Sequence, residues 1–286
     1  MTPPPPPAPA ASTRGLVADQ HATAVRQERL QEYFEREVLA GADFVCRHAA
    51  ACRGIAEARG AGAYYEGQLS HVGPSYDLRE NGVPLRVLVA PMDVGRPPSH
   101  VSMVDRSSQI AASQRAGYRG RNQHMKGTTL ALRAAFGLAL DSASETVAVG
   151  GRQTPLFDCF AMANLLLCSA VDASGGSKSL GTKIAAMRSN CSPHLLETIR
   201  VLEPTLVISQ GVDVGKELSR ALTIERQVSD RVSEARLGGL RFAFVDLRHP
   251  SRNWFTPNQA YAVDVAQPAH AAGRALALEI ASRTGR

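Results

Sequence analysis

Three side chains that could act on a ligand follow apolar, β-favouring runs in this sequence. Asp93 ends the run VPLRVLVAPMD, Asn164 lies in the apolar segment 156–168, and His249 follows the run RFAFVDLR. A carboxylate, an amide and an imidazole can accept or donate hydrogen bonds, and open α/β sheets bind ligands where their strands end. We therefore expect the three groups to converge at one sheet edge. The alternatives are a turn-forming aspartate, an amide that fixes a loop, and a solvated loop histidine.

The elements that must position these side chains alternate between strand and helix. The predicted strands and apolar segments are 83–93, 156–168, 205–210 and 241–247, and the predicted helices are 22–40, 127–140, 193–202, 213–222 and 268–282. Such alternation is typical of α/β proteins. We predict a three-layer α/β/α sandwich with a mainly parallel central sheet of about four strands.

The chain divides into three parts by composition. Residues 1–15 are rich in proline and are expected to be a disordered leader. Residues 16–60 are expected to form an N-terminal helical extension, and residues 61–286 one α/β domain. No apolar run reaches the roughly 18 residues of a membrane span, and the start lacks the features of a secretory signal. We therefore expect a cytoplasmic protein with no membrane partner.

The charge balance is basic. The chain has 32 lysine and arginine residues against 26 aspartate and glutamate residues, a formal net charge of +6. Arginine supplies most of the positive charge, and its planar fork suits phosphates and bases. The alternative is a general compositional bias toward arginine, so charge alone does not identify a partner.

Four stretches together carry a family resemblance. They are 90–95 (APMDVG), 163–168 (ANLLLC), 249–251 (HPS), and 190–195 (NCSPHL) with the Leu-Glu-Pro at 202–204 and the glycine at 211. In this order they resemble the uracil-DNA glycosylase superfamily, nearest its iron–sulfur branches. The resemblance implies a monofunctional DNA glycosylase that flips out uracil or a modified pyrimidine, hydrolyses its N-glycosidic bond and leaves an abasic site.

The resemblance also implies roles for individual residues. Asp93 would hold a water and stabilise the cation-like sugar, and His249 would donate a hydrogen bond to the departing base. Asn164 would read the edge of the flipped base. Ser251 would hold a DNA phosphate.

The loop that follows Ser251 is expected to probe DNA. Arg252, Trp254 and Phe255 lie there, and apolar side chains can wedge between bases as the target leaves the stack. The alternative for Trp254 and Phe255 is that they anchor the loop in the core.

The sequence departs from the uracil-specific pattern around Pro91. Ala90 and Met92 stand where those members carry an aspartate and a tyrosine, so Asp93 falls one residue late. His124 or Met125 would line the base pocket in place of a stacking phenylalanine. These differences favour a pocket that accepts 5-substituted pyrimidines over strict uracil specificity.

Five cysteines are present, and Cys168 and Cys191 match cluster ligands of the iron–sulfur branches, whereas Cys46 and Cys52 are farther apart than the C-x2-C pair often found there. The resemblance assigns Cys46, Cys52, Cys168 and Cys191 to a [4Fe–4S] cluster and leaves Cys159 in the core. Cys46 and Cys52 are six positions apart and do not share a helix face, so both can bind one cluster only if the helix breaks between them. The alternative is that all five are buried as small apolar residues.

DNA is the expected partner, and we expect a monomer because nothing in the sequence calls for an oligomer. Two other functions stay open. The chain could be a catalytically degenerate relative that binds DNA without cutting it, or an iron–sulfur sensor associated with DNA.

Overall fold

The computed structural model describes residues 15–94, 102–173, 180–250 and 268–284. It is mixed α/β, as expected, and residues 1–14 of the expected leader lie outside the described range. The strands are β1 (Leu16–Ala18), β2 (Leu39–Ala40), β3 (Asp43–Phe44), β4 (Ala61–Tyr65), β5 (His71–Val72), β6 (Leu78–Glu80), β7 (Val83–Leu85), β8 (Val87–Pro91), β9 (Thr146–Val149), β10 (Arg152–Pro155), β11 (Phe160–Met162), β12 (Ser169–Asp172), β13 (Leu206–Gln210), β14 (Thr223–Ser229), β15 (Val232–Leu237) and β16 (Leu240–Leu247). The helices are α1 (Gln20–Glu37), α2 (Ala49–Ala58), α3 (Met103–Arg115), α4 (Gly117–Gly120), α5 (Gln123–Ala135), α6 (Ala185–Leu202), α7 (Val212–Ala221) and α9 (Pro268–Thr284).

The largest sheet has seven strands in the order β14-β15-β16-β13-β8-β11-β5. Its four middle strands, β16, β13, β8 and β11, pair in parallel, whereas β14, β15 and β5 join antiparallel. A five-stranded sheet, β10-β9-β1-β6-β7, is antiparallel except where β1 meets β9. The sheets are therefore mixed and largely antiparallel, and parallel pairing in the central sheet is limited to its middle.

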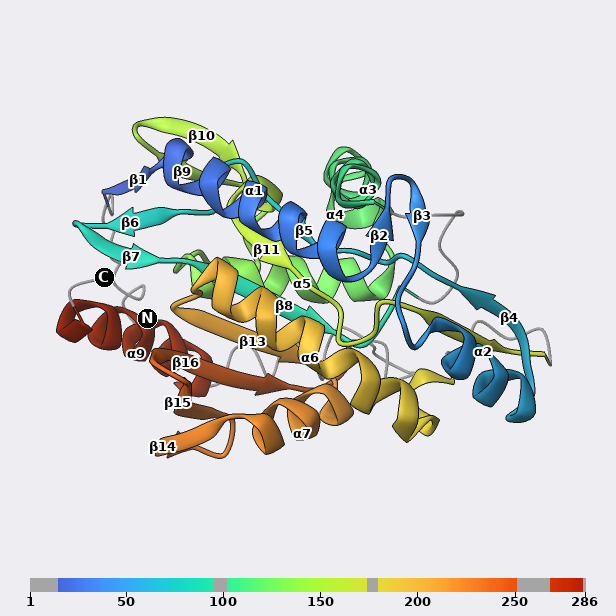
Figure 1. Ribbon diagram of the computed structural model, residues 1–286. Helices are drawn as coiled ribbons and strands as arrows, with labels where there is room; N and C mark the ends of the chain where they lie inside the picture. The colour runs from blue at the N-terminus through green and yellow to red at the C-terminus, as the bar shows by residue number, and fades with distance from the viewer. Residues whose placement is uncertain (1–14, 95–101, 174–179, 251–267, 285–286) are drawn as a thin grey trace, which may run out of the picture.

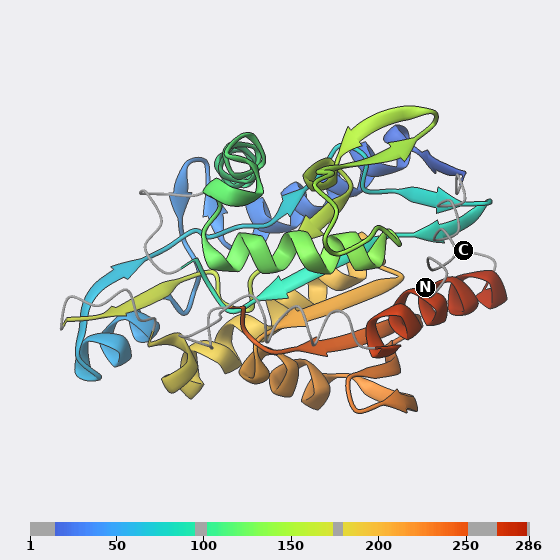
Figure 2. The same ribbon diagram turned by 180° about the vertical axis from the view of Figure 1, so that it is seen from behind.

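Helices cover both faces of the seven-stranded sheet. One hydrophobic cluster joins α1, α2, α6 and α7 to one face, and Figure 1 looks onto that side. A second cluster joins α5 and α9 to the opposite face, which Figure 2 shows from behind. Residues 16–60 belong to this architecture, because β1 pairs with β6 and α1 packs against α6. No helix among the described residues has the length and apolar character needed to cross a membrane.

The run 83–93, expected as one strand, is divided between the two sheets at Arg86. β7 lies in the five-stranded sheet and β8 in the seven-stranded one. At the break, the Arg86 backbone N–H donates to Thr205 Oγ1 at 3.0 Å, and the Arg86 carbonyl accepts from the Thr205 backbone N–H at 3.0 Å. Arg86 is buried at this break, and its guanidinium lies 3.7 Å from the Asp77 carboxylate.

The helix expected over 193–202 is longer than its sequence pattern indicates. α6 begins at Ala185 and contains Pro193 in its interior. Proline cannot donate to the carbonyl four residues earlier, and the Ser192 hydroxyl donates to that carbonyl, on Ser189, at 3.5 Å. The longer helix places Cys191 within α6 and not before it.

Candidate active site at the carboxyl edge of the sheet

The four parallel strands end at the same edge of the central sheet. Gln210 of β13 pairs with Pro91 of β8 on one side and with Leu247 of β16 on the other. Asp93 follows β8, Asn164 follows β11 and His249 follows β16. Adjacent strands lie about 4.8 Å apart, so the ends of β8 and β16, with β13 between them, are separated by about 10 Å. The predicted convergence at one sheet edge is thus present in the backbone.

The β8 turn and the Asn164 segment are hydrogen-bonded to each other. The backbone N–H of Leu165 donates to the Pro91 carbonyl at 2.8 Å, and that of Leu166 donates to the Met92 carbonyl at 2.9 Å. These bonds continue the pairing of β11 with β8 past the end of both strands. They fix Asn164 beside the turn that carries Asp93.

Gln68 fixes the turn after β8 through side-chain hydrogen bonds, a role that the sequence analysis did not predict. Its side chain is fully buried, accepts from the Val94 backbone N–H at 2.7 Å and donates to Ser169 Oγ at 2.6 Å. Both ends of the amide are therefore satisfied. No motif marks Gln68, and only its hydrogen bonds reveal its role.

Asn164 is an amide without a partner. Its side chain is 3% exposed, and neither Oδ1 nor Nδ2 has a hydrogen-bond partner. A buried amide normally finds partners, because losing its water without replacement is costly. An unpaired amide at a strand end is therefore free to bind a ligand that presents both a donor and an acceptor.

His249 is exposed, and its ring packs on one face against α5. Its ring is stacked with that of His124, with centroids 5.8 Å apart and planes at 16°. Gly211 lies on its other side, where an added Cβ would meet the ring at 3.8 Å. Loss of solvent around the ring lowers the pKa of His249, so the imidazole is neutral near pH 7 and can donate through one nitrogen.

His124 carries a second neutral imidazole at this edge. Burial lowers its pKa to about 3, with smaller contributions from the charges of His249 and Arg106. Both ring nitrogens are buried without a partner. His124 is thus one of the two side chains that the sequence analysis expected to line the pocket, and it has unused hydrogen-bonding capacity.

The start of α5 is tied to the end of β13. The Thr128 hydroxyl donates to Gln210 Oε1 at 3.2 Å and to the His124 carbonyl at 3.1 Å. The Asn122 side chain caps the helix by accepting from the Met125 backbone N–H at 2.9 Å. These contacts place the first turn of α5 over the carboxyl edge.

Two carboxylates lie near this edge. Asp93 is partly exposed in the turn after β8. Asp246, which the sequence analysis treated only as part of a strand, accepts from Ser209 Oγ at 2.7 Å and lies so close to Gly215 that a Cβ there would clash. Alternation along β16 directs Asp246 to the face opposite that of Leu247.

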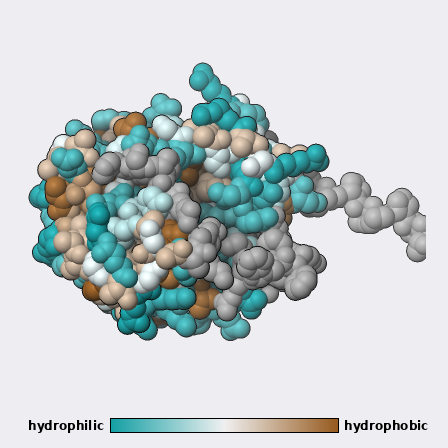
Figure 3. Space-filling view, turned by 90° about the vertical axis from the view of Figure 1, so that its right-hand side faces the viewer, coloured by the Kyte–Doolittle hydropathy of each residue, from teal (hydrophilic) through white to brown (hydrophobic). Residues whose placement is uncertain are grey.

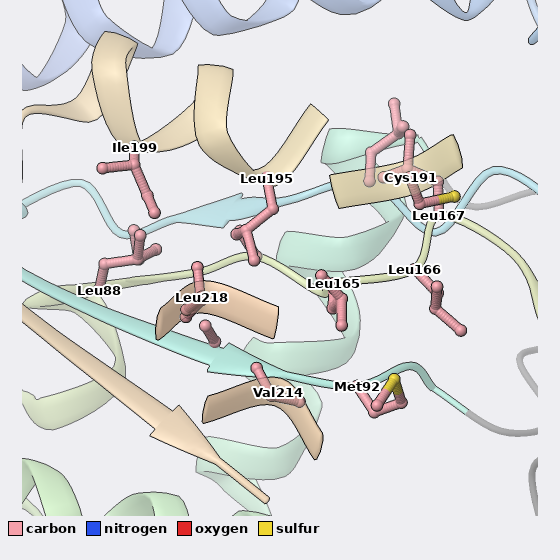
Figure 4. Close-up of a cluster of buried hydrophobic side chains, with 14 of the residues drawn as sticks. Leu88, Met92, Leu165, Leu166, Leu167, Cys191, Leu195, Ile199, Val214 and Leu218 are labelled. Carbon is pink, nitrogen blue, oxygen red and sulfur yellow. The ribbon is translucent and has the colours of Figure 1, made fainter. Parts of the chain in front are cut away.

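The expected base-binding residues other than Asn164 lie in the hydrophobic clusters. Ala90 is fully buried and Met92 is 8% exposed, both in the cluster beneath α6 and α7. Figure 4 shows Met92 near Val214 and Leu165. Met125 is 6% exposed and belongs to the cluster on the α5 face. Packing accounts for all three positions.

The expected DNA-binding residues cannot be placed, because Ser251, Arg252, Trp254 and Phe255 lie outside the described residues. Figure 3 looks onto the side of the molecule toward which β8 points in Figure 1. There, hydrophilic and hydrophobic residues of the described chain lie side by side.

Four of the five cysteines gather in one buried region. Cys46 precedes α2, Cys52 lies in its first turn, Cys168 follows the Asn164 segment and Cys191 is in α6. Because α2 begins at Ala49, no single helix contains both Cys46 and Cys52.

The four thiols are close enough for their charges to interact. Burial chiefly raises the pKa of Cys191 to about 12, and nearby Cys52 and Cys46 raise it further. Burial also chiefly raises the pKa of Cys168, and Cys191 and Cys46 add smaller contributions. Cys159 belongs to the hydrophobic cluster on the opposite sheet face.

The donor chemistry of this region suits a cluster, although the side chains as placed do not form one. Within the described ranges, no three histidine, cysteine, aspartate or glutamate side chains have a metal-binding arrangement. The buried Tyr64 hydroxyl lies beside the Cys168 thiol, and its pKa is raised chiefly by burial and further by Cys168, Cys52 and Cys191. Four thiols and one hydroxyl in one region are the residue types that serve as ligands and outer donor of an iron–sulfur group.

No protein-family model matches the chain, and no curated protein matches it in sequence.

Proposed function

We propose that the protein is a monofunctional DNA glycosylase of the uracil-DNA glycosylase superfamily, acting on uracil or a modified pyrimidine. The observation that carries the proposal is the unpartnered, buried amide of Asn164, hydrogen-bonded through its own segment to the β8 turn. The motif order and the convergence of Asp93, Asn164 and His249 at one sheet edge support it. The parallel middle of the sheet, with helices on both faces, supports the three-layer architecture of that superfamily.

In the proposed reaction, water replaces the base at the sugar carbon C1′. The C1′–N bond breaks, and its electron pair leaves with the pyrimidine. Asn164 holds the edge of the flipped base through one donor and one acceptor. Neutral His249 donates a hydrogen bond to the base oxygen on which negative charge develops.

Asp93 would act on the sugar side. Its carboxylate orients the attacking water, stabilises the cation-like sugar and takes up the proton that the water loses. The order β16-β13-β8 puts one strand between His249 and Asp93, so the two groups can act on opposite sides of the glycosidic bond.

We also propose that Cys46, Cys52, Cys168 and Cys191 hold a [4Fe–4S] cluster. The cluster would act as a structural crosslink, since hydrolysis needs no electron transfer. The four thiols come from the segment before α2, from α2 itself, from the segment after Asn164 and from α6. Holding Cys168 in place would also fix Asn164, four residues earlier.

DNA as the partner follows from the proposed reaction and is consistent with the net charge of +6. We propose that the protein acts in the cytoplasm as a monomer. Arg248, which is exposed beside His249, is positioned near the edge where DNA would approach.

The test is base excision from oligonucleotides that contain uracil or 5-substituted pyrimidines, followed by alkaline cleavage at abasic sites. The wild-type protein should release at least one of these bases. His249→Ala and Asp93→Asn should each slow release by about 100-fold or more, while His21→Gln on the surface of α1 should not. Binding without excision on every substrate would reject the enzyme and favour the DNA-binding relative.

A further inference from the structure

Arg106 on α3 is a buried cation with no anionic partner among the described residues. Arg106 as a whole residue is 7% exposed. One guanidinium nitrogen, Nη1, donates to Gln109 Oε1 at 3.3 Å, and another, Nη2, lies 3.0 Å from Met162 Sδ. The remaining nitrogen, Nε, is buried without a partner.

The other buried arginines of the described chain are satisfied differently. Arg86 lies 3.7 Å from the Asp77 carboxylate, and Arg121 is paired with Glu145. Arg133 donates to the backbone carbonyls of Leu140 and Ser144. Arg106 stands apart because its contacts are a neutral amide and a thioether, which is a weak acceptor.

Arg106 lies beneath the candidate active site. Met162, which it contacts, is the last residue of β11 and belongs to the hydrophobic cluster on the α5 face, and Asn164 follows it by two residues. The charge of Arg106 also contributes to the lowered pKa of His124. Arg106 therefore lies near two other groups with unused hydrogen-bonding capacity at this sheet edge, the His124 ring and the Asn164 amide that follows β11.

One edge of the guanidinium has no oxygen acceptor among the described residues. Nε has no partner and Nη2 meets only sulfur, and these two N–H groups point in the parallel directions that match the two oxygens of a carboxylate. Burial lowers the pKa of Arg106 to about 10, so the group is still charged at neutral pH. A permanent buried charge calls for an anion that is present in the bound ground state, whereas the charge on a departing base exists only during the reaction.

We propose that Arg106 makes this site selective for a pyrimidine that carries an acidic substituent, with Asn164 and His124 holding the ring. The inference rests on the proposed function for the identity of the site, and it names the substrate class. Arg106 binds the acidic group of the base, His249 acts on the glycosidic bond, and the two roles are separate.

The experiment measures binding of free bases to the intact protein by calorimetry, so it does not depend on excision. The probes are 5-carboxyuracil, 5-hydroxymethyluracil and uracil. Wild-type protein should bind 5-carboxyuracil at least tenfold more tightly than the two neutral bases. Arg106→Met, which places a thioether beside Met162, should remove this preference by weakening the binding of 5-carboxyuracil at least tenfold more than that of uracil.

Two further variants complete the test. Arg115→Met removes an exposed arginine from the same helix and should retain the full preference. Arg106→Lys keeps the positive charge but loses the two parallel N–H donors of the guanidinium, and should retain only part of the preference. The same variant provides the test if Arg106→Met fails to fold. Equal affinity of the wild-type protein for 5-carboxyuracil and uracil would overturn the proposal, as would equal loss of affinity for both in Arg106→Met.

The outcome is separable from the fate of the proposed function. Excision of uracil from DNA without a preference for the acidic base would overturn only the role of Arg106. Tight, Arg106-dependent binding of 5-carboxyuracil by a protein that cuts no oligonucleotide would support the anion site and reject the glycosylase.

Discussion

Asn164 and Gln68 are two buried amides near the same sheet edge, and they differ in one respect. Gln68 has partners at both ends of its amide, whereas Asn164 has none. An unsatisfied buried polar group destabilises the fold, while a satisfied one supports it. Residues that lower the stability of the fold are expected at functional sites. We therefore interpret Asn164 as a binding group and Gln68 as a structural one.

We predict that replacing the two amides by leucine has opposite effects on stability. Asn164→Leu should raise the free energy of unfolding by about 1–3 kcal/mol and abolish base excision. Gln68→Leu should lower it by about 1–3 kcal/mol, because the Val94 N–H and the Ser169 hydroxyl lose their partner. Urea unfolding of both variants measures the difference. Destabilisation by Asn164→Leu equal to that by Gln68→Leu would contradict the binding role.

At the scale of elements, buried charges join α1 to the point where the chain passes between the two sheets. Arg26 Nε of α1 bonds to Asp77 Oδ1 at 3.0 Å, and Arg86 approaches the same oxygen at 3.7 Å. Glu203, at the end of α6, bonds to Arg26 at 3.0 Å. The network fixes α1, α6 and the break between β7 and β8 relative to one another.

Asp77→Ala should destabilise the protein by about 3–5 kcal/mol, because two buried guanidinium groups lose a carboxylate. Thermal and urea unfolding provide the measurement. Arg220→Ala, which removes an exposed ion pair with Glu217, is the matched control and should cost less than about 1 kcal/mol. Equal effects of the two variants would show that the Asp77 network contributes no more than a surface pair.

The four gathered cysteines connect three elements, and their variants test the cluster. Protein purified without oxygen should contain about four iron and four sulfide per chain. Cys191→Ser should lose most of the iron and unfold more readily, while Cys159→Ala, on the opposite face of the sheet, should keep the iron. Absence of iron from anaerobically purified wild-type protein would contradict the cluster and indicate that all five cysteines are small buried apolar residues.

For the whole molecule, buried neutral histidines make stability depend on pH. Burial lowers the pKa of His71 to about 4 and that of His124 to about 3, from 6.5. The unfolded chain therefore takes up protons below about pH 6.5 that the folded chain does not. The stabilisation is complete above that pH and is lost as the pH falls toward 4 and then 3.

From pH 7 to pH 5, each of these two histidines should reduce the free energy of unfolding by about 2 kcal/mol. In His71→Gln, the loss of unfolding free energy between pH 7 and pH 5 should be about 2 kcal/mol smaller than in the wild type. In the surface variant His21→Gln, that loss should equal the wild-type loss. Urea unfolding at both pH values measures the effect. An identical pH dependence in His71→Gln and wild type would show that His71 does not stay neutral in the folded state.

The sequence predicts where along the backbone the three expected site residues lie, but not the neighbouring side chains that contact them. Asp93, Asn164 and His249 could be predicted at one edge because each follows an apolar run, and parallel strands end together. Gln68 and Arg106 could not, since neither belongs to a motif and their roles depend on which partners the folded chain provides or withholds. The longer α6 was missed because Pro193 resembles a helix start.

The fold differs most from expectation where local pattern and tertiary context disagree. Residues 83–93 form one apolar run, yet it is divided into β7 and β8 at the buried Arg86. The antiparallel strands β14 and β15 extend the sheet past its predicted last strand. The polar side chains exposed on β14 conceal that strand from a search for buried runs.

The division at Arg86 has a consequence for how this chain could change during evolution or engineering. One short run of residues sets the register of β7 against β6 and of β8 against both β13 and β11. Inserting or deleting a single residue there would reverse the inward and outward positions in one sheet or the other, and would move Asp93 relative to Asn164. Side chains in the run 83–93 can therefore change, but its length cannot, because the number of residues between β7 and β8 fixes the register of both sheets.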